Sequence, residues 1–288
     1  MAPNANTSQP KILVIGNMDK PGVPGQIDEL RPWLESHGEI LAVVAHDEPM
    51  PGLAREASLC IVFGGDGTLL SAARSLAPLG VPLLGVNMGK LGFLADYDVP
   101  HLRKHLPEIL AGNVEPIDRI MMDVVVLRGQ DVRFESSAAN DVAVSAGSPF
   151  RMIDLCVRQN DVQIAQYLGD GLVISTPSGS TGYNMSAGGP IIAPGLDALA
   201  ITPIAPHSLA IRPIVVRTTA PIVITATEVN EGTTVSIDGQ VNVPMGNEDT
   251  VQVRRSADPA RIVPHPGRNF FSTLARKLQW GQSPHHRG

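Results

Sequence analysis

Hydrophobic residues in the first third of the chain occur in short, nearly continuous runs. Such runs are typical of strands in a parallel sheet, because helices cover both faces of that kind of sheet. The spacing between the runs leaves room for a helix after each strand. This pattern predicts an α/β domain with a Rossmann-like parallel sheet. The predicted strands are residues 11–17, 39–46, 57–65 and 81–87.

The clearest helix follows the third run. Its apolar residues recur on one face of a 3.6-residue helix, and Gly80 follows as a stop signal. The sequence therefore predicts a strand, a glycine-rich turn and a helix in succession. The residues that share the apolar face are Leu69, Leu70, Ala73, Leu76 and Ala77.

From about residue 117 the hydrophobic pattern changes to a period of two, with polar turns between the segments. This pattern predicts a second, mostly antiparallel all-β domain. Asp238-Gly239 has the composition of a two-residue hairpin turn. The predicted strands lie within residues 123–134, 155–165, 211–217, 221–227, 233–237 and 241–245.

The end of the chain is helical again. Phe270, Phe271, Leu274 and Leu278 have the spacing of one helical face, with Ser272 or Thr273 near the helix start. We expect this helix to return to the first domain. The expected boundaries are a disordered leader over 1–10, an α/β domain over 11–116 plus 267–280, a β-rich domain over 117–266, and a flexible tail over 281–288.

Composition narrows the class of protein. With a net charge of −6 and a pI near 5.7, the 288-residue chain does not suit a general nucleic-acid binder, which needs a basic surface. No apolar run is long enough to cross a membrane. Cys60 and Cys156 lie inside apolar runs, which predicts two buried, reduced thiols. We therefore expect a cytoplasmic protein with small-molecule partners.

The segment Gly64–Thr68 reads GGDGT and places an acid inside a glycine-rich turn. Glycines let backbone N–H groups approach a phosphate, and a helix N-terminus favours an anion. A carboxylate at Asp66 would repel phosphate, so we expect it to face a hydroxyl as a general base or an orienting group. The alternative is a tight strand-to-helix turn in which Asp66 caps the helix.

A second polar segment, residues 170–191, follows a predicted strand. Its many small hydroxyl side chains suit the lining of a polar ligand site, and Tyr183 could stack on a base. A long surface loop is the alternative interpretation. The hydroxyl residues are Ser175, Thr176, Ser178, Ser180 and Thr181.

Taken in order, several motifs resemble the bacterial NAD kinases (the ATP-NAD kinase family). GGDGT alone is shared with lipid kinases and phosphofructokinases, but the Ser/Thr segment combined with PIAPHSL is far more specific. The resemblance runs from the third strand to the final helix. Its motifs are GGDGTLL, NMGKLGFLAD (87–96), NDVAV (140–144), residues 169–191, ITPIAPHSL (201–209) and FFSTLARKLQW (270–280).

The resemblance implies a kinase that transfers the γ-phosphoryl of ATP, or in some members of polyphosphate, to the 2′-hydroxyl of the adenosine ribose of NAD. Asp66 would be the catalytic proton acceptor, and Gly64, Gly65, Gly67 and Thr68 the phosphate loop. Mg²⁺ would arrive with ATP, without a dedicated set of protein ligands. The NAD-binding residues implied are Asp66, Gly67, Phe93, Asn140, Asp141, Arg151, Asp170, Thr181, Gly182, Tyr183, Asn184, Met185, Ser186 and Gln240.

The resemblance also implies a homodimer or homotetramer, with NAD bound between the two domains. A lipid kinase and a dinucleotide sensor without catalysis are the rival interpretations. A lipid kinase would need an apolar groove or a basic membrane face, which an acidic chain fits poorly, and a sensor would gain nothing from the Asp66 carboxylate. We expect Asp238 to serve the turn, His207 to be a hydrogen-bonded structural imidazole, and His285 and His286 to lie in the flexible tail.

Two positions depart from the family pattern. Gly182 replaces an alanine, which should only loosen the loop, and Leu168 replaces a basic residue. Because leucine offers neither charge nor a hydrogen-bond donor, we expect NADH to be accepted as well as NAD.

Overall fold

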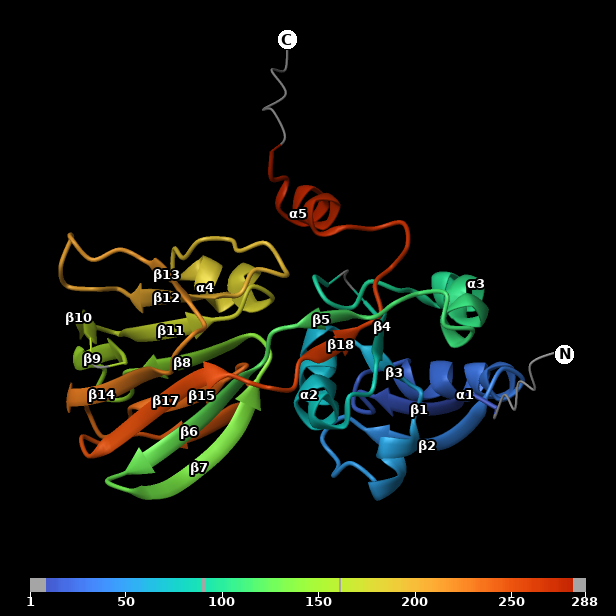
Figure 1. Cartoon of the computed structure of the whole chain (residues 1–288), viewed down its shortest axis with the longest axis horizontal. Helices are drawn as coiled ribbons and strands as arrows, with labels where there is room; N and C mark the ends of the chain where they lie inside the picture. Colours follow the sequence, from blue (N-terminus) through green and yellow to red (C-terminus); the bar gives the residue numbers. More distant parts are fainter. Residues whose placement is uncertain (1–8, 90–91, 161, 282–288) are drawn as a thin grey trace, which may run out of the picture. The chain divides into compact units, whose positions relative to one another are not determined.

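The structure is a computed structural model, and it describes residues 9–89, 92–160 and 162–281. The chain divides into two compact units (Figure 1). Unit 1 contains the residues up to 117 and those from 261 onward, and unit 2 contains residues 118–260. Residues 1–8 of the expected leader lie outside the described residues, as do residues 282–288 of the expected tail with His285 and His286.

Unit 1 is built on a sheet with the strand order β2-β1-β3-β4-β18-β5. Strands β1, β2, β3, β4 and β18 pair in parallel, which confirms the predicted α/β class. β3 is buried along its whole length, whereas β2 is partly exposed because it lies at the edge. The strands are β1 (Lys11–Gly16), β2 (Glu39–Ala45), β3 (Leu59–Gly64), β4 (Leu83–Asn87), β5 (Ile117–Arg119) and β18 (Ala260–Ile262).

Helices α1 (Val23–Glu35), α2 (Asp66–Leu76) and α3 (Val99–Leu110) connect the strands, and the short 3₁₀ turns η1 (Gly52–Glu56) and η2 (Ala77–Leu79) lie between them. Each helix buries residues spaced three or four apart, as an amphipathic helix must. The predicted face of α2 is buried. Gly80, with φ +66°, ends η2 rather than α2 itself. The buried apolar side chains are Val23, Ile27, Leu30 and Leu34 in α1, Leu69, Leu70, Ala73 and Leu76 in α2, and Leu102, Leu106 and Ile109 in α3.

The last helix, α5 (Phe270–Leu278), starts near Ser272, as predicted, but buries fewer apolar residues than its spacing predicts. Its cap is Asn269, whose side chain accepts the Ser272 N–H over 2.9 Å, while Ser272 Oγ accepts the Asn269 N–H in return. Of the four apolar residues expected on one buried face, Leu274 is buried but Phe271 and Leu278 are exposed. The helix therefore leaves apolar side chains at the surface of the described chain.

Contacts of Arg268 and Lys277 connect the segment around α5 to the rest of unit 1. The Arg268 guanidinium donates a hydrogen bond to the Asp96 carbonyl oxygen. The Lys277 ammonium lies 4.2 Å from the centre of the Phe93 ring, within the range of a cation–π interaction. Both contacts reach the loop that follows β4.

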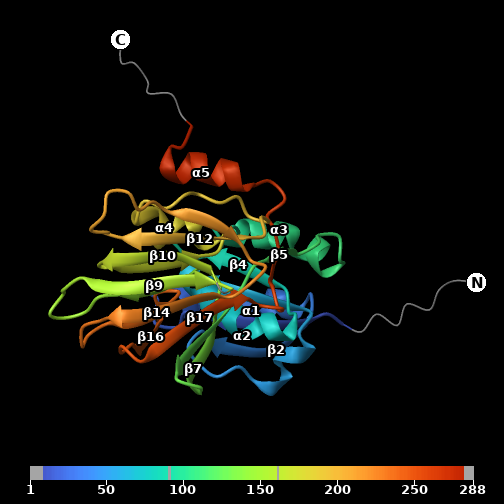
Figure 2. The same ribbon diagram turned by 60° about the vertical axis from the view of Figure 1, so that its left-hand side comes forward.

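Unit 2 consists of two six-stranded antiparallel sheets with the orders β10-β9-β14-β17-β6-β7 and β13-β12-β11-β8-β15-β16 (Figures 1 and 2), as predicted. The first contains β6 (Met122–Arg128), β7 (Asp131–Ala138), β9 (Ile153–Gln159), β10 (Val162–Gly169), β14 (Ile222–Glu228) and β17 (Asp249–Arg255). The second contains β8 (Asp141–Ser145), β11 (Gly171–Ser175), β12 (Ala198–Ile204), β13 (Ile214–Arg217), β15 (Thr234–Ile237) and β16 (Val241–Pro244).

Side chains from both sheets form one hydrophobic core, so unit 2 is a β-sandwich. Alternate residues of β6 and β9 enter this core, in agreement with the period of two. β11 is instead buried on both faces, because the segment with η3 (Gly179–Thr181) and α4 (Tyr183–Ser186) packs on it. The alternation also explains why Cys156 is only partly buried, since it faces outward on β9. Cys60 is buried as predicted, and burial raises the pKa of its thiol.

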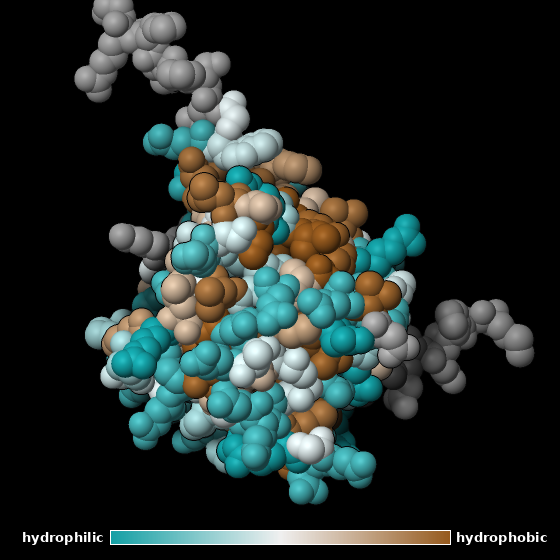
Figure 3. Space-filling view, turned by 90° about the vertical axis from the view of Figure 1, so that its left-hand side faces the viewer, coloured by the Kyte–Doolittle hydropathy of each residue, from teal (hydrophilic) through white to brown (hydrophobic). Residues whose placement is uncertain are grey.

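The surface view in Figure 3 shows hydrophobic groups lying among hydrophilic ones. Unit 2 has several large apolar side chains that are mostly exposed, among them Leu209 at 88%, Phe150 at 77% and Val162 at 68%. None of the described helices is both long and apolar enough to span a membrane.

Candidate active site

Asp66 is the first residue of α2, and Gly65 alone separates it from the end of β3. Its Oδ2 accepts the backbone N–H of Phe93 over 2.7 Å. Its Oδ1 accepts the N–H groups of Leu94 and Ala95 over 3.1 and 3.0 Å. The Asp66 side chain thus holds the loop after β4 by three consecutive backbone donors, which fixes the carboxylate in one position.

Among the described residues, these hydrogen bonds leave Asp66 with unused acceptor capacity. A carboxylate offers about four lone-pair sites, and three are occupied by the hydrogen bonds from residues 93–95. Oδ2 takes part in only one of them. Asp66 is also partly exposed. An incoming hydroxyl can therefore donate to Oδ2 without displacing the loop.

Gly92 makes the approach of this loop possible. A Cβ added at Gly92 would lie 1.8 Å from Asp66 Oδ1, well inside van der Waals contact. Gly64 is constrained in the same way, since its Cβ would lie 2.2 Å from Thr68 Oγ1. Gly92 was not among the predicted site residues, although its place in the motif at 87–96 was a signal.

The carboxyl ends of β1, β3 and β4 meet beside Asp66. The N–H of Asn17 donates to the Phe63 carbonyl over 3.1 Å, and that of Met88 donates to the Gly64 carbonyl over 2.8 Å. Lys20 lies at the same edge, because its Nζ approaches Gly89 closely: a Cβ atom added to Gly89 would be 3.0 Å from Lys20 Nζ. This positive charge was not predicted, although a lysine shortly after the first strand was an available signal.

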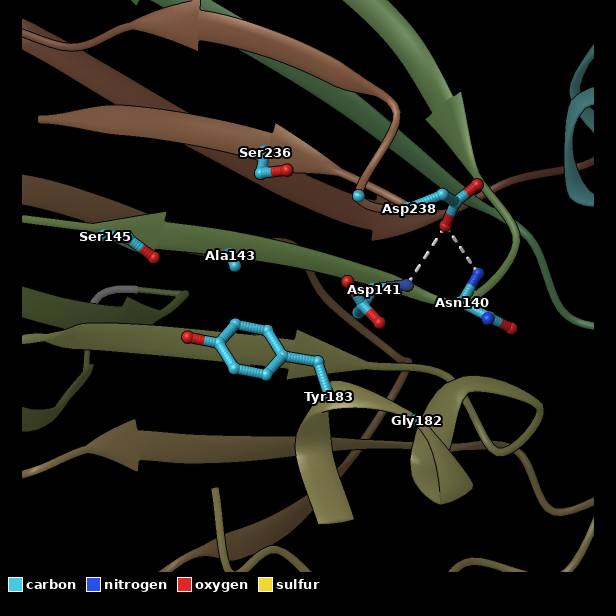
Figure 4. A pocket seen from close by; sticks show the side chains of 9 residues that line it. Asn140, Asp141, Ala143, Ser145, Gly182, Tyr183, Ser236 and Asp238 are labelled. Carbon is cyan, nitrogen blue, oxygen red and sulfur yellow. Dashed lines mark hydrogen bonds between the residues drawn. The ribbon is translucent and has the colours of Figure 1, made fainter. Parts of the chain in front are cut away.

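Unit 2 contains a pocket of about 430 Å³ (Figure 4). Tyr183 from α4 extends along one side of it, and small side chains from β8 and β15 face it from the other side. The pocket therefore has the form of a slot with one aromatic wall. The lining residues are Asn140, Asp141, Ala143, Ser145, Gly182, Tyr183, Ser236, Asp238 and Gly239.

Asp238 organises one end of this pocket. Its Oδ1 accepts the N–H groups of Asn140 and Asp141 over 2.7 and 3.1 Å, and its Oδ2 accepts that of Ala139 over 3.0 Å. Asp238 and Gly239 also form the predicted two-residue turn between β15 and β16, with φ values of +51° and +65°. The predicted turn at this dipeptide is confirmed. The three hydrogen bonds from residues 139–141 to Asp238 were not predicted.

Asp141 is buried at the wall of the pocket, with only 7% of its surface exposed. Burial, and secondly the negative charge of Asp238, raise the pKa of Asp141 to about 7. Its carboxyl therefore gains or loses a proton near neutral pH.

The hydroxyl residues of segment 170–191 do not line the pocket, contrary to expectation. Thr176 Oγ1 donates to the Ala139 carbonyl over 2.7 Å, and Ser180 Oγ to the Pro177 carbonyl over 2.7 Å. Ser175, Thr176, Ser180 and Thr181 are all buried. The hydroxyls of Ser175, Thr176 and Ser180 satisfy buried backbone carbonyls, which otherwise would lack partners.

Asn184 belongs to the same internal network. It is fully buried, donates to the Ser180 and Pro190 carbonyls over 3.0 Å each, and accepts from Thr202 Oγ1 over 2.6 Å. Its side chain therefore stabilises the loop that presents Gly182 and Tyr183 to the pocket.

The structure brings together only part of the expected NAD-binding set. Asn140, Asp141, Gly182 and Tyr183 line the pocket, whereas the other expected residues of unit 2 do not. Asp66, Gly67 and Phe93 belong to unit 1. The residues of unit 2 outside the pocket lining are Arg151, Asp170, Thr181, Asn184, Met185, Ser186 and Gln240; of these, Arg151, Asp170, Ser186 and Gln240 are exposed.

Two further expectations concern β10 and the loop after β12. His207 is exposed rather than buried, so the expected role as a structural imidazole is not supported; its backbone N–H donates to the Leu168 carbonyl over 2.8 Å. Leu168 itself is 41% exposed on β10 and accessible to a ligand. In the described part of the chain, no group of three or more His, Cys, Asp or Glu is arranged to hold a metal ion.

A glycine-rich turn with an available carboxylate, at the carboxyl edge of a parallel sheet, is suited to phosphoryl transfer. A slot with an aromatic wall suits a nucleobase. Together these features define a nucleotide-dependent phosphotransferase.

Comparisons with known proteins identify the family. The family model for the ATP-NAD kinase N-terminal domain matches residues 46–114, and that for the ATP-NAD kinase C-terminal domain matches residues 139–265. The NAD kinase of Geobacter sulfurreducens is 38% identical over 284 residues, which cover 94% of this chain and 99% of the relative. The NAD kinase of Syntrophotalea carbinolica is 41% identical over 239 residues, which cover 83% of each chain.

Solved structures agree with this result. An NAD kinase from Archaeoglobus fulgidus in complex with ATP has a TM-score of 0.74 at 27% identity, covering 93% of this chain and 98% of the other. Yeast NADH kinase complexed with NADH has a TM-score of 0.83 at 18% identity, covering 98% and 91%, and supports the fold alone. The chain belongs to the ATP-NAD kinase family, and its reaction is the ATP-dependent phosphorylation of NAD to NADP.

Proposed function

We propose that Asp66 is the general base of this reaction and that the acceptor is the 2′-hydroxyl of the adenosine ribose of NAD. The supporting observation is the carboxylate that three backbone N–H groups hold in place while Oδ2 keeps an acceptor site open. A fixed base near the attacking oxygen contributes about 10²- to 10⁴-fold to the rate.

In the proposed step, the ribose 2′-oxygen forms a bond to the γ-phosphorus of ATP. The bond between that phosphorus and the oxygen bridging to the β-phosphate breaks, and ADP leaves with the electron pair. The hydroxyl proton passes to Asp66 Oδ2. Because the transition state is loose, positioning of the two substrates supplies most of the acceleration.

The proposed site for the adenosine half of NAD is the pocket of unit 2. The slot beside Tyr183 is lined by small side chains such as Ala143 and Ser236, so a planar base can lie against the ring. Asn140 and Asp141 provide polar groups for the ribose and base. The remaining residues of the expected set would contact the rest of NAD from outside this pocket, or, like Asn184, support the loop.

The proposed site for the triphosphate is the carboxyl edge of the sheet in unit 1. The backbone N–H groups of Gly65, Gly67 and Thr68 lie at the N-terminus of α2, which favours an anion. Lys20 adds a positive charge at that edge. The family uses ATP with a divalent metal; we propose that Mg²⁺ enters as MgATP, where it neutralises charge on the phosphates. Use of polyphosphate as an alternative donor stays a prediction.

The direct test is incubation of the purified protein with NAD and MgATP, coupled to an NADP-specific dehydrogenase. We expect continuous formation of NADPH that requires both substrates. Asp66→Asn should abolish this signal, whereas Asp249→Asn, a change at a buried acid of β17 outside both proposed sites, should retain it. If Asp66→Asn retains the signal as Asp249→Asn does, Asp66 is not the general base.

Self-association as a homodimer or homotetramer is also part of the proposal. The mostly exposed Phe150, Val162 and Leu209 are apolar side chains available for contacts between subunits. Light scattering coupled to size-exclusion chromatography would give the subunit number, and a monomer would contradict the proposal. The cytoplasmic location inferred from the sequence stays a prediction.

A further inference from the structure

Asp238 contacts a segment far away in the sequence. The N–H groups that it accepts belong to residues 97 to 99 positions earlier, Ala139, Asn140 and Asp141. Two of these, Asn140 and Asp141, line that end of the pocket, and Figure 4 shows the Asp141 carboxyl there. The position of these side chains in the pocket therefore depends on Asp238.

The hairpin turn alone does not require an acid at this position. Asn-Gly serves a two-residue turn with positive φ values at least as well as Asp-Gly. An asparagine side chain, however, has a single acceptor oxygen, whereas the structure uses both oxygens of Asp238. The carboxylate is thus explained by residues 139–141 rather than by the turn.

Asp238 also places a negative charge beside Asp141. The other ionisable side chain that lines the pocket is Tyr183, from α4. On the strand that pairs with β8 from the other side, the residue opposite Asp141 is Ser175, which carries no charge. The carboxyl groups that line this pocket are those of Asp141 and Asp238, and the negative charge of Asp238 disfavours ionisation of Asp141.

We propose that Asp238 is a positioning residue for NAD: it fixes Asn140 and Asp141 at the pocket wall, and its charge makes NAD binding by Asp141 depend on pH. This inference rests on the proposed placement of the adenosine half of NAD in the pocket of unit 2.

The direction of the dependence follows from the hydrogen bonds available. The ribose hydroxyls and the adenine amino group of NAD donate hydrogen bonds, so they favour Asp141 as a carboxylate. Because the pKa of Asp141 is about 7, the carboxylate fraction falls with pH below neutrality. NAD binding then has to release a proton, and the affinity falls by up to about tenfold per pH unit.

The test is calorimetric titration of the full chain with NAD, without ATP, between pH 5.5 and pH 8.5. For the parent we expect the dissociation constant to rise about tenfold from pH 8 to pH 6. Titrations in buffers of different ionisation enthalpy should show proton release at pH 6.5. In Asp238→Asn the rise should shrink to about threefold or less, because the neighbouring charge is removed.

Two further variants separate the possible outcomes. Asp249→Asn alters a buried, hydrogen-bonded acid outside the pocket and should leave the pH dependence unchanged. Asp141→Asn should remove both the pH dependence and the proton release. If Asp141→Asn binds NAD with unchanged affinity and proton release, the placement of NAD in this pocket is wrong, and the inference falls with it.

If Asp141→Asn weakens NAD binding but the pH dependence of Asp238→Asn equals that of the parent, the placement stands and the inference about the charge of Asp238 is overturned. A parent affinity that is constant over the whole pH range would also overturn it. NADPH formation by the parent is measured separately in the coupled assay, so the activity of the protein is judged independently of both binding results.

Discussion

The backbone N–H of Phe93 lies 2.7 Å from Oδ2 of Asp66, and this bond joins the turn after β3 to the loop after β4. Asp238 makes an equivalent set of contacts in unit 2, where its carboxylate accepts three consecutive N–H groups of residues 139–141. Each unit thus uses one acid to hold a loop that carries candidate site residues. In both cases the acid recognises backbone, so the side chains of the bound loop remain available for other contacts.

Replacement of Asp66 by asparagine should abolish turnover while NAD binding is retained. The amide cannot accept the proton of the 2′-hydroxyl, so we expect kcat to fall by about 10²- to 10⁴-fold with a dissociation constant for NAD near that of the parent. Steady-state kinetics and calorimetry measure the two quantities. Turnover within about threefold of the parent would show that Asp66 is not the base.

A second variant distinguishes the carboxylate from its position. Gly92→Ala keeps Asp66 but places a methyl group where Asp66 Oδ1 now lies, so the loop or the carboxylate has to move. We expect kcat to fall by at least about tenfold and the melting temperature to drop, because contacts of residues 93–95 weaken. Full activity in Gly92→Ala would mean that the observed position of the carboxylate does not matter for the reaction.

Tyr183→Ala should weaken NAD binding by roughly 1 to 3 kcal/mol, on the scale of a base stacked on an aromatic ring. Tyr183→Phe retains the ring and should bind within about threefold of the parent, since only the hydroxyl is lost. The measurement is the dissociation constant for NAD at one pH. If Ala and Phe variants both bind as tightly as the parent, the slot beside Tyr183 does not hold the base.

Leu168 should allow phosphorylation of NADH as well as NAD. Its exposed apolar side chain offers no cation or hydrogen-bond donor with which to discriminate the nicotinamide rings. We expect the ratio of kcat/KM for the two substrates to lie below about a hundredfold, equivalent to roughly 2.7 kcal/mol of discrimination. Leu168→Arg should change this ratio, and Val162→Arg, at another exposed position on β10, serves as the control. A ratio above a hundredfold in the parent would refute the prediction.

His265 should make the stability of the protein sensitive to acid. Burial, followed by the charges of Arg268, His101 and His105, lowers the pKa of His265 to about 4, from an ordinary value of 6.5. The folded-state pKa is depressed, so the neutral ring contributes stability above pH 6.5 that is lost as pH falls towards 4. The melting temperature of the parent should therefore decrease between pH 7 and pH 5.

The variant His265→Gln cannot be protonated, and its melting temperature should fall by about 3 °C less than that of the parent over this interval. His207→Gln, at an exposed histidine, should follow the parent. Equal acid sensitivity in the parent and His265→Gln would exclude His265 as the source.

Local patterns were sufficient to predict most of the fold. The apolar runs predicted β1, β3 and β4, and the period of two predicted β6, β7, β9 and β10. These predictions succeed because burial of one or both faces of a strand determines which of its successive residues are apolar. Asp238-Gly239 identified its turn for the same reason. The prediction for α5 was less accurate, since a helical spacing does not show which of its apolar residues find a partner.

The candidate site was only partly predictable. Asp66 was identified from its own motif, but its bonds to residues 93–95 and those of Asp238 to residues 139–141 join distant segments. Thr176 and Ser180 were expected to face a ligand, because composition cannot distinguish a polar lining from hydroxyls that satisfy a buried backbone. Only the packed structure decides between these possibilities.

The insertion of unit 2 between β5 and β18 determines the order in which the chain can fold during synthesis. Residues 118–260 are contiguous, so this sandwich can form as soon as it has left the ribosome. The sheet of unit 1 is incomplete until β18 is made, because Ile262 of β18 pairs with Leu83 of β4. The hydrogen bond from Arg268 to the Asp96 carbonyl also forms only after that segment is made. Unit 1, which carries Asp66, is therefore completed last, and a nascent chain of which only residues up to about 260 have emerged would hold a finished sandwich while the sheet of unit 1 still lacks β18.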